Sequence, residues 1–230
     1  MRLYVIRHGE TSWNVARKLQ GHAGADLDEK GVRLAEETAE ALASVPFDLC
    51  ITSPLIRALH TARIIVGKRR IPILEDPRIM EIGFGEWEGL CVAPDHYEIP
   101  GDGFLKFHAD PFAYEAPPGG ETIGDVCKRT GEFLQEVIHT PEYQDKTLLI
   151  STHGCALRGL LNSVYENPKD FWQGGVAMNC AVSIVDVKDG KPVLVQSDKV
   201  YYDASECVNH YAAAEQMAAE YAKGNIHENK

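Results

Sequence analysis

Short apolar runs that end abruptly in polar residues recur three times along the chain. The first is Leu3–Ile6, the second covers residues 47–52, and the third covers residues 147–152. Charged residues or histidine follow the first and third runs at once, and a serine and a proline follow the second. Runs of this length and character are typical of strands that are buried on both faces of a parallel sheet. We therefore predict three parallel core strands, each ending where polar residues begin.

The segments that follow these runs have helical periodicity. Residues 28–45 place one apolar stripe at Val32, Ala35, Ala39 and Leu42, with the spacing of one face of a helix. After the second run, Ser53 is expected to cap a helix that has Pro54 at its first position. The buried face of that helix is expected at Leu55, Ala58, Leu59, Ala62 and Ile65.

Two further signals mark a helix and a hairpin in the second half of the chain. Thr122 and Asp125 have the spacing of a capping box, and the helix after them would bury Val126, Phe133 and Val137. Residues 179–187 and 191–197 are predicted to be strands, because they are rich in β-branched residues. The intervening turn contains an Asp-Gly pair, which favours a hairpin.

Alternation of strands and helices predicts an α/β fold, a mostly parallel central sheet with helices on both faces. We expect one domain over residues 1–230, which is ordinary for this length. Residues 91–120 are rich in proline and aromatic side chains and have no clear period, so they are expected to form an irregular, lid-like excursion. The alanine-rich residues 209–223 are expected to form a C-terminal helix.

Composition narrows the classes of partner. A net charge of −11 argues against nucleic acid or an anionic membrane as a partner, because binding many phosphates needs a basic surface. No stretch is long and apolar enough to span a bilayer, and the N-terminus lacks the apolar core of a signal peptide. The six cysteines show no CxxC pair or dense framework, which favours reduced thiols. The expected location is the cytoplasm.

Chemistry-bearing residues follow the strands where a parallel sheet brings strand ends together. Arg7 and His8 follow the first run, Arg57 lies in the first turn after the second, and His153 with Gly154 follows the third. In open α/β sheets, ligands bind at the carboxyl ends of the strands. Guanidinium groups and helix N-termini both suit the oxygens of a phosphate group. The sequence therefore predicts a phosphate site at this edge.

A set of motifs in fixed order resembles the histidine phosphatase superfamily, which includes the cofactor-dependent phosphoglycerate mutases. The motifs are RHGETSWN, LQG, SPLIRALHTA, EIGFGEWEG, PGGET and STHG. The resemblance extends from Arg2 to about Asp186 and implies the phosphoglycerate mutase-like fold. It also implies catalysis through a phosphohistidine, with a small phosphorylated metabolite as substrate.

The resemblance assigns a role to each motif residue. His8 would be the nucleophile, and Arg7 and Arg57 would bind the phosphate oxygens and keep the His8 ring unprotonated. His153 would complete the phosphate clamp as a cationic donor. Glu81 would be the general acid that protonates the leaving alcohol and then activates water, although Glu86 and Glu88 lie close by in the sequence.

Supporting residues are assigned by the same resemblance. Asn14, Gln20, Gly21 and Gly154 would bind substrate, and Glu10, Ser53 and Thr152 would orient the residues that contact it. His22 adjoins the LQG motif and could touch substrate. The other histidines match no shared motif and are expected at the surface. No cofactor and no metal are expected, because the arginines supply the positive charge and no third patterned ligand accompanies His8 and His153.

Hydrolysis is favoured over phosphoryl shuttling by the charge of residues 91–120. Lys106 is the only lysine or arginine there, against five acidic residues, so a second phosphate or a carboxylate would find few partners. The expected activity is that of a phosphomonoesterase, either like an α-ribazole phosphatase or of broad specificity. A cofactor-dependent phosphoglycerate mutase and a non-catalytic phospholigand-binding protein are the alternatives. A homodimer is left open.

Overall fold

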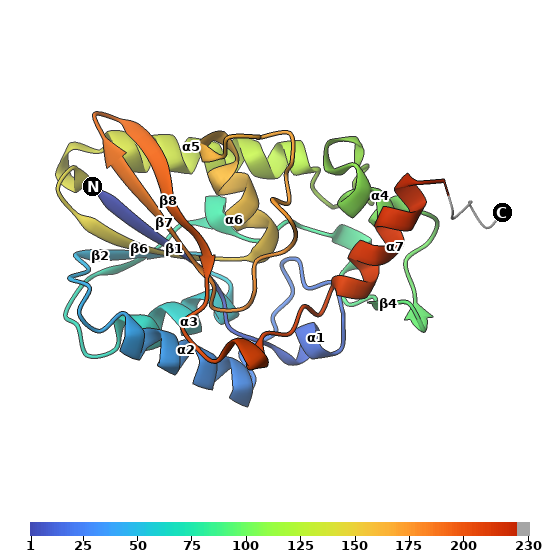
Figure 1. The fold of residues 1–230 in the computed structure, drawn as a ribbon, viewed down its shortest axis with the longest axis horizontal. Coiled ribbons are helices and arrows are strands. Elements are labelled where there is room, and N and C mark those ends of the chain that lie inside the picture. Colours follow the sequence, from blue (N-terminus) through green and yellow to red (C-terminus); the bar gives the residue numbers. More distant parts are fainter. Residues whose placement is uncertain (225–230) are drawn as a thin grey trace.

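One six-stranded sheet organises the protein, for which a computed structural model describes residues 1–224 (Figure 1). The strand order is β3-β2-β6-β1-β7-β8, in which the first four strands are mutually parallel and β7 pairs antiparallel with both β1 and β8. This arrangement confirms the predicted α/β fold with a mostly parallel sheet. The strands are β1 (Arg2–Arg7), β2 (Leu49–Thr52), β3 (Ile73–Glu75), β6 (Thr147–Thr152), β7 (Val182–Lys188) and β8 (Lys191–Lys199).

Strand register brings the predicted site residues to one edge of the sheet. In the β1–β6 pair, Arg7 lies opposite Thr152, so His8 and His153 follow neighbouring strands at the same level. In the β2–β6 pair, Thr52 lies opposite Ser151, which places Ser53 beside them. The three polar strand ends therefore meet because the apolar runs are paired without a shift.

Helices cover both faces of the sheet (Figure 1). Helices α2 (Glu29–Ala41) and α3 (Ile56–Val66) pack on one face, and α5 (Ile123–His139) and α6 (Gly154–Leu161) pack on the other. Successive residues of β1 alternate between the two resulting cores. Leu3 and Val5 join the α5–α6 core, whereas Tyr4 and Ile6 join the α2–α3 core.

Helix starts agree with the sequence at α5 and differ at α3. Thr122 and Asp125 form the predicted capping box. Helix α3 begins at Ile56, with Leu55 as an N-cap that makes no side-chain bond, so the predicted cap at Ser53 is wrong. The Ser53 hydroxyl still accepts the Leu55 N–H at 3.2 Å, which forms a tight turn before the helix.

The buried face of α2 is rotated slightly from the predicted stripe. Ala35 and Leu42 are buried as predicted, but Val32 and Ala39 are only half-buried. Leu34 is buried instead, together with Thr38, whose hydroxyl donates to the Leu34 carbonyl at 2.8 Å. That bond inside the helix allows a polar side chain to be buried here.

Residues 91–120 contain more regular structure than predicted. They form a two-stranded ribbon of β4 (Val92–Ala93) and β5 (His96–Tyr97), followed by α4 (Gly103–Ala109). Helix α7 (Ala212–Ala222) packs on α4, within the predicted range of the C-terminal helix (Figure 1). Phe104 and Phe107 of α4 belong to a third apolar cluster, which Ala214 of α7 joins and Tyr211 packs against.

Short elements connect these parts. The β7–β8 turn holds Asp189 and Gly190 at φ values of 52° and 70°, the left-handed conformation that an Asp-Gly hairpin needs. The edge strand β3 was not predicted. The remaining short helices are α1 (Ser12–Val15), η1 (Pro77–Ile79), η2 (Gly85–Trp87), η3 (Pro111–Ala113), η4 (Pro141–Tyr143), η5 (Asn162–Val164) and η6 (Ala204–Glu206).

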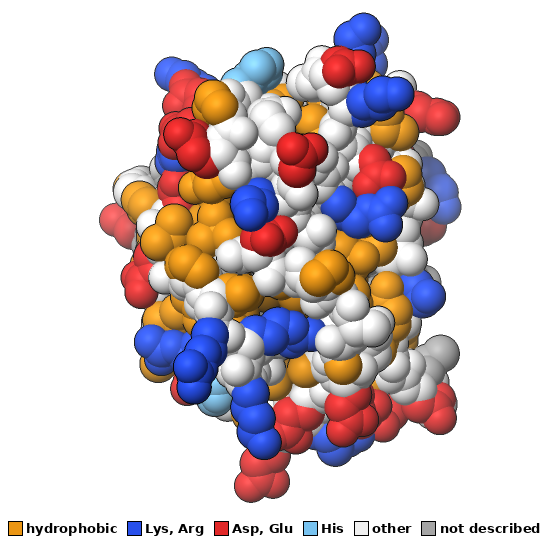
Figure 2. Space-filling model, turned by 90° about the vertical axis from the view of Figure 1, so that its left-hand side faces the viewer, with side chains coloured by type: hydrophobic (Ala, Val, Ile, Leu, Met, Phe, Trp, Pro, Cys, Tyr) orange, Lys and Arg blue, Asp and Glu red, His pale blue; other side chains and the backbone are white. Residues whose placement is uncertain are grey.

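Charge on the end of the molecule where the parallel strands begin is mixed. Figure 2 shows acidic and basic side chains interspersed among apolar ones on this end, with no continuous basic field. Within residues 1–224, none of the helices has the length and apolar character needed to cross a bilayer.

Candidate active site

One cavity at the carboxyl ends of the strands gathers most of the predicted site residues. The space between its lining atoms measures about 470 Å³, a value that includes open solvent. The predicted residues that line it are Arg7, His8, Asn14, Gln20, Gly21, Arg57, Glu81 and Gly154. His153 is not part of the lining, but its ring centroid lies 5.1 Å from that of His8. Residues from five separate stretches of chain therefore converge as predicted.

The His8 ring is held in one orientation with one nitrogen free. Its Nδ1 lies 2.7 Å from the Gly9 carbonyl oxygen, to which it must donate, so Nε2 carries the lone pair. The residue is 2% exposed. Burial, followed by the charges of Arg57 and Arg7, holds the pKa of His8 well below its ordinary value. The ring is therefore an unprotonated base at neutral pH.

Two buried arginines flank His8 with unused donors. Arg57 donates to the carbonyls of Ala23 at 2.9 Å and Gly21 at 2.7 Å, and Arg7 donates to the carbonyl of Ala177. In both arginines Nε is buried and has no partner within the described residues. Burial lowers the pKa of Arg57 to about 10, so it stays charged at neutral pH. Unpaired buried N–H groups beside a positive centre suit an anion.

His153 is not the cationic donor that we predicted. Burial, together with the charge of Arg57, holds the pKa of His153 well below its ordinary value, so the ring is neutral. Its Nε2 lies 2.8 Å from the Ser53 hydroxyl, which supports the orienting role expected for Ser53. Its Nδ1 is buried and unpartnered among the described residues. A neutral imidazole still has one N–H to donate to a phosphate oxygen.

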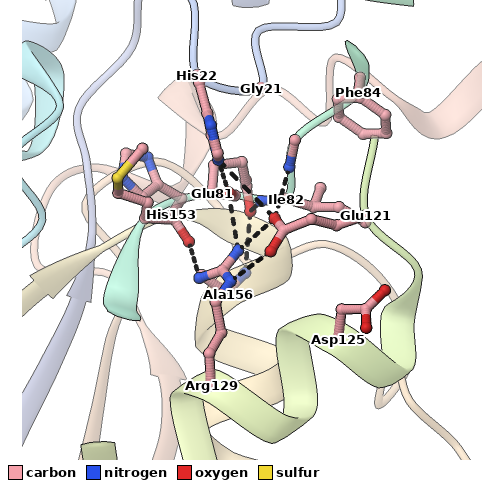
Figure 3. A network of polar contacts seen from close by, with 12 residues as sticks. Gly21, His22, Glu81, Ile82, Phe84, Glu121, Asp125, Arg129, His153 and Ala156 are labelled. Atoms are coloured by element: carbon pink, nitrogen blue, oxygen red, sulfur yellow. Dashed lines mark hydrogen bonds and ion pairs between the residues drawn. The ribbon is translucent and has the colours of Figure 1, made fainter. Parts of the chain in front are cut away.

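Glu81 occupies the N-terminus of α6. Its carboxylate accepts the backbone N–H of Ala156 at 2.9 Å and of Cys155 at 3.3 Å, as well as its neighbour Ile82 at 3.0 Å (Figure 3). A carboxylate is favoured at this positive helix end. We predicted that helix N-termini would bind the phosphate, but at α6 these two N–H groups bind Glu81 instead.

Arg129 fixes the backbone beside Glu81, and sequence reasoning missed it. From α5 it donates to the carbonyl oxygens of Met80 at 2.7 Å and Glu81 at 2.9 Å, and it pairs with both oxygens of Glu121 (Figure 3). His22 donates to the same Glu81 carbonyl at 2.9 Å. His22 therefore supports the loop that carries Glu81 rather than lining the cavity, which differs from its predicted substrate contact.

Asn14 contacts a residue from the far end of the chain. Its side chain caps α1 together with Thr11, and its Nδ2 lies 3.4 Å from the hydroxyl of Tyr211. Tyr211 lines the cavity just before α7, and nothing in the sequence pattern predicted it. The N-terminal and C-terminal parts of the chain therefore meet at the cavity.

Gln20 and Gly21 lie in the loop that Arg57 holds. Gln20 is buried, and its side-chain oxygen has no partner within the described residues. Gly21 has a φ of 50°, and a Cβ atom there would lie 2.1 Å from a Glu88 carboxylate oxygen. Glycine at this position permits both the turn and the close approach.

Two residues expected to orient the site have other contacts. Glu10 accepts from His210 at 2.6 Å and from Lys30 at 3.4 Å, so it anchors the C-terminal segment. The Thr152 hydroxyl donates to the Ile79 carbonyl at 2.8 Å and positions the chain before Glu81. Both residues are buried, but in the structure neither forms a hydrogen bond with the side chain of His8, Arg7 or Arg57.

Metal-binding clusters are absent from the described part of the chain. Within residues 1–224, no three side chains of histidine, cysteine, aspartate or glutamate lie close enough to hold a metal ion. All six cysteines are free thiols. The groups that the cavity does offer are a free imidazole nitrogen, two guanidiniums and a carboxylate, which suit transfer of a phosphoryl group to nitrogen.

Comparison with known proteins agrees with this geometry. A family model described as histidine phosphatase superfamily (branch 1) matches residues 3–199. A protein of Proteus mirabilis named "Probable phosphoglycerate mutase" is 33% identical over 82% of this chain and 86% of its own length. The adenosylcobalamin/alpha-ribazole phosphatase of Salmonella typhimurium is 32% identical over 83% of this chain and 92% of its own length.

A solved structure has the same fold. The YhfR protein of Bacillus stearothermophilus superimposes with a TM-score of 0.78 and is 36% identical, over 86% of this chain and 97% of its own. The family model ends before Tyr211, so the contact of the C-terminal segment with the cavity lies outside the matched region.

Proposed function

Because the chain belongs to branch 1 of the histidine phosphatase superfamily, we propose that it is a phosphomonoesterase that acts through a phosphohistidine on His8. The observation that carries this proposal is the fixed tautomer of His8, whose Nδ1 donates to Gly9 and leaves Nε2 free beside two guanidiniums. An enzyme of this superfamily needs a nucleophile, a clamp for the phosphate and a general acid, and the cavity offers a candidate for each.

In the first step, Nε2 of His8 attacks the phosphorus atom and the bond from phosphorus to the ester oxygen breaks. The unpaired Nε donors of Arg7 and Arg57 bind phosphate oxygens and stabilise their charge in the transition state. Glu81 in its protonated form gives its proton to the leaving oxygen.

In the second step, a water molecule attacks the phosphorus atom of phosphohistidine, and the bond from phosphorus to Nε2 breaks. The Glu81 carboxylate takes a proton from this water, so the acid of the first step becomes the base of the second. Inorganic phosphate leaves, and His8 and Glu81 return to their starting states. Arg129 and the N-terminus of α6 hold Glu81 in place through both steps.

Hydrolysis fits the cavity better than mutase activity. A mutase must hold a second anionic group, whereas Arg7 and Arg57, both beside His8, are the only charged basic side chains of residues 1–224 that line the cavity. The names of related proteins include both phosphatases and a probable mutase, so the mutase is the second candidate. The substrate would be a small phosphorylated metabolite, with an α-ribazole phosphate or a broad set of esters as candidates. The free thiols favour a reducing compartment such as the cytoplasm.

Trapping of the phosphoenzyme tests the covalent step. Wild-type protein quenched during turnover of a labelled ester should carry acid-labile, hydroxylamine-sensitive phosphate, and His8→Ala should carry none and lose turnover. His139→Ala, which changes a histidine far from the cavity, should keep both. Full activity in His8→Ala would refute the covalent mechanism. A bisphosphoglycerate-primed mutase assay, run in parallel, should give no interconversion of phosphoglycerates, and a rate equal to that of hydrolysis would favour the second candidate.

Leaving-group dependence tests Glu81. Glu81→Gln should slow hydrolysis of alkyl phosphates by about 100-fold or more, because their alkoxides need a proton. It should slow hydrolysis of para-nitrophenyl phosphate far less, since para-nitrophenolate leaves without one. An equal loss on both esters would show that another group is the acid. EDTA should leave the rates unchanged if, as we propose, no metal takes part.

A further inference from the structure

Several aromatic rings line the cavity. Phe84, Phe104, Phe107 and Trp172 all line it, and each is less than a tenth exposed. Their rings form one continuous cluster. Phe107 lies 5.0 Å from Trp172, 5.3 Å from Phe104 and 5.4 Å from Phe84, measured between ring centroids. We call these four residues the aromatic wall.

Charged partners for a leaving group are scarce in the cavity. Among the described residues that line the cavity, only Arg7 and Arg57 are cations, and the charges of both act on His8. Among the described residues, Glu81 is the only carboxylate that lines the cavity. A leaving group that carried its own carboxylate or phosphate would therefore be desolvated without a cation to pair with, which is unfavourable.

His108 supplies an unused polar atom next to the aromatic wall. It lines the cavity from α4, and its ring contacts Phe104, Phe107 and Trp172 at centroid distances of 5.1 to 5.2 Å. Its Nε2 is buried and has no hydrogen-bond partner within the described residues. Burial lowers the pKa of His108 to about 3, so the ring is neutral. Depending on its tautomer, Nε2 can donate or accept one hydrogen bond without introducing charge. Leaving such an atom unpaired costs free energy, which a suitable ligand would recover.

From this arrangement we propose that the aromatic wall binds the leaving group of a phosphomonoester whose alcohol carries an uncharged aromatic ring, and that His108 Nε2 makes one hydrogen bond with a polar atom of that ring. The inference rests on the proposed hydrolase function and names the substrate class for it. Specificity would come from ring stacking and from the single polar atom, whereas the phosphate end would be bound alike for every ester.

Buried aromatic clusters are also common as plain structural cores, and the position of this one distinguishes it. Tyr97 and Tyr114 belong to the same cluster and have buried, unpartnered hydroxyl groups, yet neither lines the cavity. The aromatic wall and His108 do line it, and they share it with His8 and Glu81. A ring bound there would be attached directly to the ester under attack.

A panel of alkyl phosphates tests the proposal on wild-type protein. Ethyl phosphate and 2-phenylethyl phosphate release primary alcohols of similar acidity, so their kcat/KM values differ mainly through binding of the ring. We expect 2-phenylethyl phosphate to exceed ethyl phosphate by about 10- to 100-fold, the range for a large apolar group in a fitted pocket. Phosphoserine and 3-phosphoglycerate should not exceed ethyl phosphate.

The two levels of the proposal fail in different ways. If ethyl phosphate is hydrolysed through phosphorylated His8 but the phenyl group gives less than a tenfold advantage, or if the carboxylate-bearing esters are better than 2-phenylethyl phosphate, this inference is wrong and the hydrolase function stands. If no ester releases phosphate, the proposed function itself fails.

His108 is tested by the ratio between ring-bearing esters. The 2-(indol-3-yl)ethyl ester offers a ring N–H, and the 2-(pyridin-3-yl)ethyl ester offers a ring acceptor. In wild-type protein, at least one of these two esters should have a kcat/KM several-fold above that of 2-phenylethyl phosphate. His108→Phe, which keeps an aromatic ring, should reduce this ratio of kcat/KM values to about one. Phe112→Leu changes an exposed aromatic residue that does not line the cavity and should leave the ratio as in wild type. An unchanged ratio in His108→Phe would exclude the hydrogen bond.

Discussion

Acid should destabilise the folded protein because two histidines are buried in their neutral form. Burial holds the pKa values of His8 and His153 well below the ordinary value of 6.5. The unfolded chain takes up a proton on each ring near pH 6.5, whereas the folded protein does not. As the pH falls below about 6.5, the unfolded state therefore binds more protons, and the free energy of unfolding decreases.

The size of the effect follows from linkage. Between about pH 7.5 and about pH 5.5, proton binding lowers the free energy of an unfolded histidine by about 1.4 kcal/mol. A folded histidine with a much lower pKa is stabilised by almost nothing over the same range. Together the two rings should lower the free energy of unfolding by about 3 kcal/mol across this window. His108, which burial also keeps neutral, adds to the decrease. Carboxylates such as Asp76, whose pKa lies below its ordinary 3.8, titrate below this window.

Urea denaturation at a series of pH values measures this dependence. The comparison is made within each protein, so a change in absolute stability does not affect it. Between about pH 7.5 and about pH 5.5, the free energy of unfolding of His8→Asn should fall by about 1.4 kcal/mol less than that of wild type. His96→Gln, at an exposed side chain, should follow wild type. If His8→Asn has the full wild-type slope, His8 is not held neutral by the fold, and the reasoning behind its proposed role as nucleophile fails.

Two further predictions concern positioning and close packing. Arg129→Lys should lower kcat by about 10- to 100-fold with a smaller change in KM, because a lysine cannot bind the carbonyl of Glu81 and its neighbours together. The loss of kcat should be largest for esters of poor leaving groups. A uniform loss on all esters would point to general instability. Gly31→Ala should destabilise the protein by about 2 to 4 kcal/mol in urea melts, since its Cβ would lie 2.0 Å from the Glu10 carbonyl oxygen. Gly131→Ala, in the interior of α5 with open space around it, should stabilise the protein by about 0.5 to 1 kcal/mol. Equal changes in stability for Gly31→Ala and Gly131→Ala would contradict the packing argument.

The sheet could be predicted because its core strands contain continuous apolar runs. Leu3–Ile6, residues 49–52 and residues 148–152 are buried on both faces, and the helices between them have separate apolar stripes. Strand β3, in contrast, has three residues, all at least partly exposed, at the edge of the sheet. Its pairing with β2 is set by the backbone rather than by a sequence period, so no pattern marks it.

The site was predictable where strand ends supply it and unpredictable where tertiary packing does. His8, Arg57 and the residues of the third strand end follow from parallel strand order alone. Arg129 looks like an ordinary charged residue on the outer face of α5, and its bonds to the carbonyls before Ile82 depend on how η1 packs against that helix. Tyr211 reaches the cavity only because α7 docks on α4, a contact between segments about a hundred residues apart.

The largest cause of the lowered pKa of His8 is burial, so lowering this pKa is not the main role to expect for Arg7 and Arg57. The charges of Arg57 and Arg7 act in the same direction, but as smaller causes. Replacing Arg57 by a neutral residue would therefore leave His8 largely unprotonated at neutral pH, provided that the ring stays buried. The loss of activity in such a variant would then report the missing charge on the phosphate oxygens in the transition state. The buried, unpaired Nε atoms of the two arginines are the donors placed for that role.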